Sequence, residues 1–213
     1  MQRRSYGQYC SLAKALDLVG DRWTLLILRD LLAGPRRFKD MLKGLPGIGS
    51  NLLSSRLKFL EEQGLIAKTD LPAPVSSMGY VLQPRGRDLE SALKALARWG
   101  VPLLLEKGED LWRPEWNVLA LKARFQGHLA RDFNATLLLE IDGYSHYLVV
   151  EDGSLSIHEG VPPKADVRVS TTGETFLALF HKGTISLAEA EQAGRVEVEG
   201  DRALLARIGT VFR

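Results

Sequence analysis

The sequence has little of what a disulfide or a membrane span requires. Its single cysteine, Cys10, has no partner within the chain for a disulfide. No apolar run approaches the roughly 20 residues that a membrane-spanning helix needs. The basic N-terminus is followed by an amphipathic segment and not by the apolar core of a leader peptide. We therefore expect a cytoplasmic protein without a membrane span.

The residues of catalytic and metal sites are also scarce and scattered. The four histidines, which lack the spacing of metal ligands, are His128, His146, His158 and His181. The sequence contains no Gly-rich phosphate loop, no Gly-x-Ser-x-Gly elbow and no nucleophile paired with a base. Carboxylates such as Asp142 and Asp152 precede glycines, as turn residues do. We predict no enzyme, no cofactor and no metal site.

Charge, in contrast, is divided unevenly along the chain. Residues 1–105 contain 16 Lys and Arg against 9 Asp and Glu, a net charge of +7. Residues 106–213 contain 12 against 17, a net charge of −5. Only the first half therefore suits a polyanion such as DNA.

Apolar periodicity predicts several helices in the first half. Ser11–Val19 repeats apolar residues at helical spacing before Gly20, and Asp21 stands as the N-cap of a buried helix over 22–34. After Pro35, a short basic helix is expected to open with Arg36, Arg37 and Lys39. A turn at 45–49 leads into a fourth helix over 50–63.

The helix over 50–63 has two distinct faces. One face is apolar and should point to the core; it consists of Leu53, Leu57 and Leu60. The other is small and polar; its members are Asn51, Ser54, Ser55 and Lys58, with Ser50 at the helix start. Short hydroxyl and amide side chains can enter a major groove and bond base edges, but serine and asparagine also occur on ordinary surfaces.

Two short strands follow, over 65–69 and 79–82, joined by a proline-containing loop. A further amphipathic helix over 85–99 carries Leu89, Leu93, Leu96 and Trp99 on one stripe. Helices followed by a hairpin are the order of a winged helix-turn-helix domain. Such domains usually pair about a two-fold axis, which predicts half-sites about 34–36 Å apart on DNA.

The first half resembles the HxlR family of winged-helix regulators, relatives of MarR. The resemblance covers about residues 8–100 and rests on four motifs: Gly20-Asp21-Arg22-Trp23, Gly34-Pro35-Arg36-Arg37-Phe38, Leu60-Glu61-Glu62-Gln63-Gly64-Leu65 and Arg98-Trp99-Gly100. It implies a homodimer that binds double-stranded DNA through Ser50, Asn51, Ser54, Ser55 and Lys58, supported by the basic residues Arg36, Arg37, Lys39 and Lys68.

Three departures from the family pattern affect this comparison. Gly49 replaces the Ser or Thr that usually caps the recognition helix. The wing, residues 72–80, lacks the arginine expected near its tip. Ser11 follows Cys10 where the family usually has proline.

The second half predicts an α+β domain with an antiparallel sheet. A charged connection at 106–117 precedes a helix over 118–125. Strands are expected at 136–141, 144–150, 155–157, 167–170 and 194–200, and helices at 174–182, 187–191 and 202–212. The domains are therefore placed at 1–105 and 118–213.

Residues 118–213 resemble the sterol-carrier-protein-like family, through Val169-Ser170-Thr171-Thr172 followed by a helix, then Gly194-Arg195-Val196-Glu197-Val198-Glu199-Gly200-Asp201 and a last helix. The resemblance implies an apolar pocket for a hydrophobic small molecule. The expected lining residues are Leu177, Phe180, Leu204, Ile208 and Phe212. The alternative is that these five side chains only fill a core.

Two functions are compatible with the sequence. The first is a DNA-binding transcription regulator, a homodimer modulated by a hydrophobic effector in the second domain. The alternative is a lipid or small-molecule carrier in which the first half only dimerises; the +7 charge favours the regulator. Cys10 is a candidate redox sensor, because Arg3, Arg4 and Lys14 would favour its thiolate. A buried small apolar residue is the alternative for Cys10.

Overall fold

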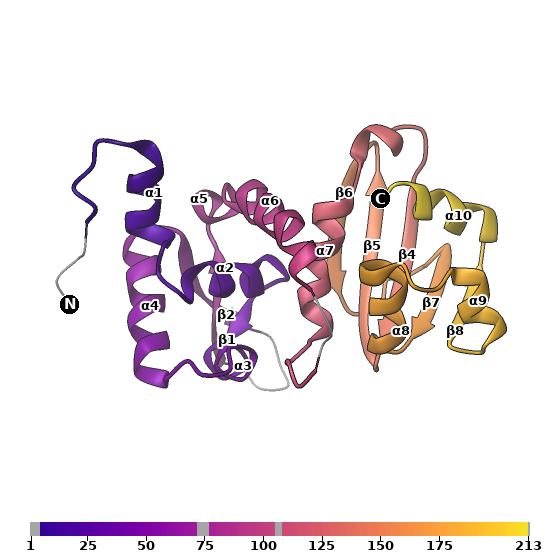
Figure 1. The fold of residues 1–213 in the computed structure, drawn as a ribbon, viewed down its shortest axis with the longest axis horizontal. Coiled ribbons are helices and arrows are strands. Elements are labelled where there is room, and N and C mark those ends of the chain that lie inside the picture. The colour runs from indigo at the N-terminus through magenta and orange to yellow at the C-terminus, as the bar shows by residue number, and fades with distance from the viewer. Residues whose placement is uncertain (1–4, 72–76, 105–107, 213) are drawn as a thin grey trace. The chain divides into compact units, whose positions relative to one another are not determined.

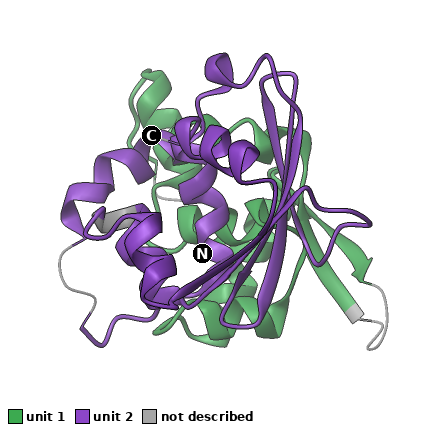
Figure 2. Ribbon diagram, turned by 90° about the vertical axis from the view of Figure 1, so that its right-hand side faces the viewer, with its two compact units in different colours: residues 1–93 green, residues 94–213 purple. Residues whose placement is uncertain are grey.

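The computed structural model describes residues 5–71, 77–104 and 108–212 (Figure 1). The chain divides into two compact units, residues 1–93 and 94–213 (Figure 2). The division falls between Leu93 and Lys94, inside a helix. No helix among the described residues is long and apolar enough to cross a membrane.

The first unit is built on four helices and a small sheet (Figure 1). The helices are α1 (Ser11–Val19), α2 (Thr24–Leu32), α3 (Phe38–Gly44) and α4 (Ser50–Glu62). Each contributes buried apolar side chains to the unit, and those that are fully buried include Ile27, Leu28, Met41, Leu53, Leu57 and Leu60. Each such side chain stabilises the fold by about 1.5–3 kcal/mol relative to exposure.

Two predicted helix starts are wrong. Asp21 does not cap α2; the N-cap is Trp23, and the Asp21 carbonyl accepts from the Thr24 N–H at 3.0 Å. Arg36 and Arg37 do not begin a helix either. They form strand β1 (Arg36–Arg37), and α3 begins at Phe38. The reason is a partner distant in sequence, because Arg36 pairs with Tyr80 and Arg37 with Gly79.

The predicted hairpin is confirmed and is part of a three-stranded sheet in the order β1-β3-β2. Strand β2 (Ile66–Leu71) pairs antiparallel with β3 (Ser77–Leu82). The loop at 72–76, where the wing tip was expected, lies outside the described residues. Gly79 sits between the two neighbouring strands, where an added Cβ would lie 3.2 Å from the Arg36 carbonyl oxygen.

The single helix expected over 85–99 is in fact two. Helix α5 (Pro84–Arg87) ends before α6 (Glu90–Gly100) begins. The first turn is tied to the hairpin, because the Gln83 N–H donates to the Leu65 carbonyl at 3.0 Å. Gly86 packs against that same carbonyl so closely that a Cβ would overlap it. The chain therefore turns between the two helices.

The second unit contains a five-stranded sheet in the order β6-β5-β4-β7-β8, which confirms the α+β class. The strands are β4 (Ala135–Ile141), β5 (Tyr144–Glu151), β6 (Ser154–Glu159), β7 (Val167–Thr171) and β8 (Val196–Gly200). Three of the four pairings are antiparallel, as expected, and the central β4–β7 pairing is parallel.

Two tight turns make the antiparallel hairpins of this sheet. The residue pairs Asp142-Gly143 and Asp152-Gly153 join β4 to β5 and β5 to β6, and all four residues have positive φ. Positive φ at both central residues is the geometry of a type I′ turn, which matches the twist of paired strands. The predicted turns are confirmed.

Helices of the second unit contribute to its core alongside the strands. They are α7 (Asn117–Arg124), α8 (Gly173–Leu177), α9 (Leu187–Gln192) and α10 (Arg202–Thr210), with a π-helical turn, η4 (Ala178–Lys182), after α8. Three short 3-10 helices also occur: η1 (Val101–Leu103), η2 (Pro114–Trp116) and η3 (Gly127–Leu129).

The connection expected at 106–117 belongs to the second unit from Trp112 onward. The Trp112 ring packs on the core of that unit and approaches Gly173 so closely that a Cβ there would overlap it. Pro114 is also buried. A charged segment with one proline thus ends in a docked tryptophan, which its composition does not reveal.

Candidate DNA-binding surface and ligand cavity

Helix α4 presents a polar ridge on a rigid support. Leu53, Leu57 and Leu60 have no exposed surface and fix one side of the helix in the core of the first unit. The opposite side is exposed and holds the five side chains expected there: Ser50, Asn51, Ser54, Ser55 and Lys58. The structure therefore brings these five residues together on one face.

The start of α4 has an open backbone terminus. Gly49 is the N-cap in an extended conformation, and no side chain caps the helix. The Gly49 carbonyl accepts from the Leu53 N–H at 3.0 Å, so the helix begins without strain. The first N–H groups of α4 have no partner within the helix and can donate to an anion such as a phosphate.

Both ends of α4 are tied to other parts of the first unit. Arg56 forms an ion pair with Asp21 in the α1–α2 loop. Beyond the C-terminal end, the Arg85 guanidinium of α5 donates to the Gln63 carbonyl at 2.7 Å. These contacts fix the direction of the helix, which a side chain reading a DNA groove requires.

A hollow beside α4 gathers further polar residues from the hairpin. It is lined by Ser54, Lys58, Glu61, Glu62, Lys68 and Tyr80. Lys68 of β2 pairs with Glu61 at 3.2 Å, and Lys58 lies 4.0 Å from Glu62. Exposed pairs of this kind contribute little to stability. Both ammonium groups can therefore exchange a carboxylate for a phosphate at small cost.

The three basic residues after Pro35 have different surroundings. Arg36 is half-buried and its Nε donates to the Asp30 carbonyl of α2 at 3.4 Å. Arg37 is half-exposed on β1, and Lys39 is exposed on α3. Arg36 is thus directed to the protein interior, while Lys39 faces outward.

Cys10 precedes α1 and is exposed, so the interpretation as a buried apolar residue is wrong for the single chain. Its carbonyl accepts from the Lys14 N–H at 2.9 Å, which makes Cys10 the N-cap of α1. Arg3 and Arg4, expected near the thiol, lie outside the described residues.

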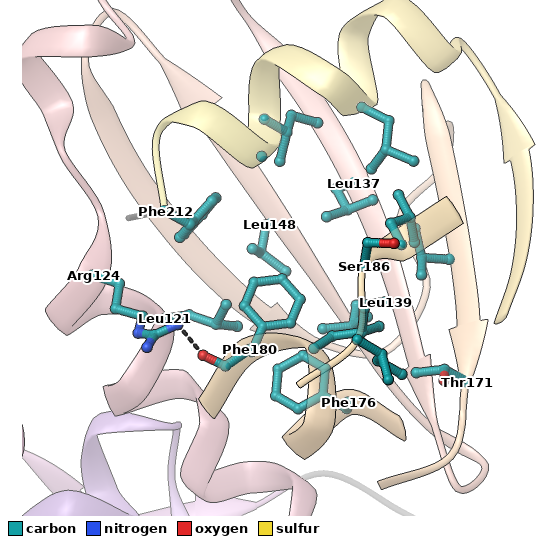
Figure 3. A pocket seen from close by; sticks show the side chains of 17 residues that line it. Leu121, Arg124, Leu137, Leu139, Leu148, Thr171, Phe176, Phe180, Ser186 and Phe212 are labelled. Atoms are coloured by element: carbon teal, nitrogen blue, oxygen red, sulfur yellow. Dashed lines mark hydrogen bonds between the residues drawn. The ribbon is translucent and has the colours of Figure 1, made fainter. Parts of the chain in front are cut away.

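The second unit encloses an apolar cavity of about 340 Å³ between its sheet and its helices (Figure 3). This volume lies at the lower end of the range for small-molecule sites. The lining residues are Leu121, Arg124, Leu137, Leu139, Leu148, Val169, Thr171, Phe176, Leu179, Phe180, Ile185, Ser186, Leu187, Leu205, Ile208, Gly209 and Phe212.

Three of the five residues expected in a pocket lie on the cavity wall: Phe180, Ile208 and Phe212. Leu177 and Leu204 do not line it, and Leu204 packs instead against the core. The rings of Phe176 and Phe180 stack with centroids 4.6 Å apart. They border the cavity on the side of η4 (Figure 3).

The sequence did not reveal the strand residues of the wall or Arg124. Leu137 and Leu139 of β4 alternate with outward-facing residues, and that alternation marks a buried face without separating a cavity from a core. Arg124 is half-buried at the end of α7 and donates to the Phe180 carbonyl (Figure 3). Its position depends on contacts with η4, which follows more than 50 residues later.

Comparison with protein families divides the chain in the same order. Residues 18–107 match the HxlR-like helix-turn-helix family, and residues 120–213 match the SCP-2 sterol transfer family. The cavity lies within the second match. The polar ridge of α4 lies within the first.

Individual relatives match the first half only. An HTH-type transcriptional regulator of Mycobacterium tuberculosis (strain ATCC 25618 / H37Rv) is 41% identical over 112 residues, which are 53% of this chain and 66% of the relative. The chain thus spans just under two thirds of the length of that relative. The crystal structure of the reduced form of the regulator YodB from Bacillus subtilis matches 48% of this chain and 100% of its own, at 30% identity and a TM-score of 0.39.

A third relative, an HTH-type transcriptional regulator of Synechocystis sp. (strain ATCC 27184 / PCC 6803 / Kazusa), is 34% identical over 94 residues. These are 44% of this chain and 70% of the relative. Together with the family match over residues 18–107, this identity shows that the chain belongs to the HxlR family of helix-turn-helix transcription regulators.

Proposed function

We propose that the protein is a homodimeric repressor or activator that binds a specific operator with α4 in the major groove. The observation that carries this proposal is the α4 ridge, five small or flexible polar side chains backed by three leucines without exposed surface. Asn51, Ser54 and Ser55 can bond base edges, since amide and hydroxyl groups donate and accept in the groove. Ser50 at the helix start suits a phosphate.

The basic residues around the ridge suit the DNA backbone. In this proposal Lys58, Lys68, Arg37 and Lys39 contact phosphates, and Arg36 holds β1 against α2. Phosphate contacts set the register of a protein on DNA without reading its sequence. The net charge of +7 over residues 1–105 supports the same assignment.

Exposed apolar side chains support the homodimer. On α1, Leu12 is 65% exposed and Leu16 is 38% exposed, and Trp99 on α6 is 73% exposed. Large apolar groups in water are typical of surfaces that bind a partner. We assign DNA binding and dimerisation to residues 1–105 and ligand binding to residues 118–213, where a hydrophobic effector in the cavity modulates DNA affinity.

Binding of variants to DNA tests the ridge. The operator is first selected from a random duplex library, and dissociation constants are then measured by fluorescence anisotropy across single-base variants of that operator. Asn51→Ala and Ser55→Ala should lose discrimination at particular base pairs, each by about 1–3 kcal/mol. Arg37→Gln should weaken all sequences alike and reduce the salt slope by about 0.9.

Ser91→Ala is the matched control, because Ser91 is an exposed helical serine on α6, outside the ridge. It should leave both the sequence preference and the salt slope unchanged. Uniform losses for Asn51→Ala, Ser55→Ala and Arg37→Gln would contradict the ridge assignment. A chain that binds apolar ligands but no duplex DNA would be a carrier instead.

A further inference from the structure

The ligand cavity contains a single charged side chain. Among its described lining residues, Thr171 and Ser186 are polar but uncharged, Arg124 carries a positive charge, and no aspartate or glutamate occurs. The remaining wall is apolar. A ligand that fills this space therefore meets a hydrophobic surface along most of its length and one guanidinium at one place.

Arg124 differs from other arginines of the second unit in what it contacts. Arg113, Arg168 and Arg202 each form an ion pair with a glutamate. Arg124 is half-buried, and its bond in the described part of the chain runs to a neutral group, the Phe180 carbonyl. That bond uses Nη1 and leaves further N–H donors of the guanidinium.

The position of Arg124 is fixed on both sides. The helix α7 ends at this residue, and the bond to η4 holds the guanidinium beside Phe180, whose side chain lines the same cavity (Figure 3). A cation held in place loses little conformational entropy when an anion binds, so its affinity for an anion is raised.

We propose that the cavity takes an amphiphile with one carboxylate head and an apolar tail, and that Arg124 binds the head. The inference rests on the proposed ligand-binding role of this domain and names its ligand class. One guanidinium balances one negative charge, and its planar N–H groups fit a carboxylate in a bidentate manner. A volume of about 340 Å³ favours a single chain or ring system over a lipid with several chains.

Calorimetric titration with matched probes tests the head group. The full-length protein is freed of copurified lipid and titrated at pH 7 with decanoate, 1-decanol and decyltrimethylammonium, which share the same tail. We expect decanoate to bind about tenfold or more tightly than 1-decanol, because hydrogen bonds to charged groups are strong. Decyltrimethylammonium should bind more weakly than 1-decanol, because its charge repels the guanidinium.

The variant Arg124→Met keeps an apolar stem and removes the charge. It should abolish the preference for decanoate and leave the 1-decanol affinity within about twofold of the wild type, a result that unfolding would not produce. Arg124→Lys should restore part of the preference, because it returns the charge without the planar N–H groups. Arg131→Met, an exposed arginine outside the cavity lining, is the matched control and should behave as the wild type.

The outcomes separate this inference from the proposed function. Equal affinity for decanoate and 1-decanol in the wild type, or a preference that survives in Arg124→Met, would overturn the role of Arg124 while leaving an apolar ligand site. Absence of binding for every probe would overturn both the ligand class and the ligand-binding role of the domain.

Discussion

At the scale of single residues, Glu189 shows how local hydrogen bonds set a titration. Its Oε2 accepts from the Ser186 N–H and the Ser186 hydroxyl, both at 2.7 Å, in the capping box that begins α9. The backbone and hydroxyl donors lower the pKa of Glu189, and the positive charge of Arg195 acts in the same direction. Both donors favour the ionised carboxylate.

We predict that the capping box of α9 weakens in acid. Because the pKa of Glu189 is lower in the folded chain, its stabilising contribution is present above the unfolded pKa. It is lost as pH falls through the lowered folded pKa. Titration of the Glu189 side-chain carboxyl by NMR should show the lowered pKa, and Ser186→Ala should raise it toward its ordinary value. An unchanged pKa in Ser186→Ala would contradict this account.

Gly209 offers a residue at which the cavity can be blocked. It lines the cavity from α10, and an added Cβ meets no atom within 4 Å. Gly209→Phe should therefore fold, gain helix propensity, and place a ring at the cavity wall. We expect calorimetry to show loss of binding for both decanoate and 1-decanol, with an unchanged circular dichroism spectrum. Wild-type affinity for both probes would show that the ligand lies elsewhere.

At the scale of elements, the contact between α5 and the hairpin depends on one glycine. An added Cβ at Gly86 would overlap the Leu65 carbonyl oxygen, which is backbone and cannot move alone. Gly86→Ala should destabilise the first unit by about 1–3 kcal/mol, the usual cost of overpacking. Urea denaturation followed by circular dichroism measures the change.

Gly49→Ser is the control for that substitution. Gly49 has open space around an added Cβ, and a serine there can accept from the first N–H groups of α4. The expected change is a gain of a few tenths of a kcal/mol, opposite in sign to the loss for Gly86→Ala. Equal stability of the two variants would mean that the backbone moves to admit a methyl group at 86.

The same scale explains what could be predicted from sequence. Leu53, Leu57 and Leu60 repeat at helical spacing, so α4 and its polar face followed from periodicity. The hairpin turns of the second unit followed from Asp-Gly pairs. Both signals lie within a few residues of the structure that they specify.

The features that were missed depend on partners distant in sequence. Arg36 and Arg37 form a strand only because β3, more than 40 residues later, offers its edge. Arg124 lines the cavity through a bond to η4, and Trp112 docks near Gly173. Leu177 and Leu204 were placed in the pocket because a core side and a cavity side of a helix have the same periodicity.

At the scale of the whole molecule, Arg124 connects the cavity with a second groove. That groove is lined by the C-terminal half of α6, by η1 and by α7, and its residues include Ala97, Arg98, Val101 and Arg124. The Arg98 guanidinium also donates to the Ala123 carbonyl at 3.0 Å, next to Arg124. A ligand that draws Arg124 into the cavity therefore alters contacts with α6, the helix on which the proposed dimer surface lies.

We predict that decanoate and operator DNA change each other's affinity by the same factor. Reciprocity follows from linkage, and couplings of this kind typically reach fivefold or more. Anisotropy measures the operator affinity with and without saturating decanoate, and calorimetry measures the decanoate affinity with and without operator. Gly209→Phe should keep the DNA affinity and lose its response to decanoate. Arg98→Met removes the donor to Ala123 and should reduce the coupling factor without weakening decanoate binding. Operator affinity that decanoate leaves unchanged, despite tight decanoate binding, would show that the cavity does not regulate DNA binding.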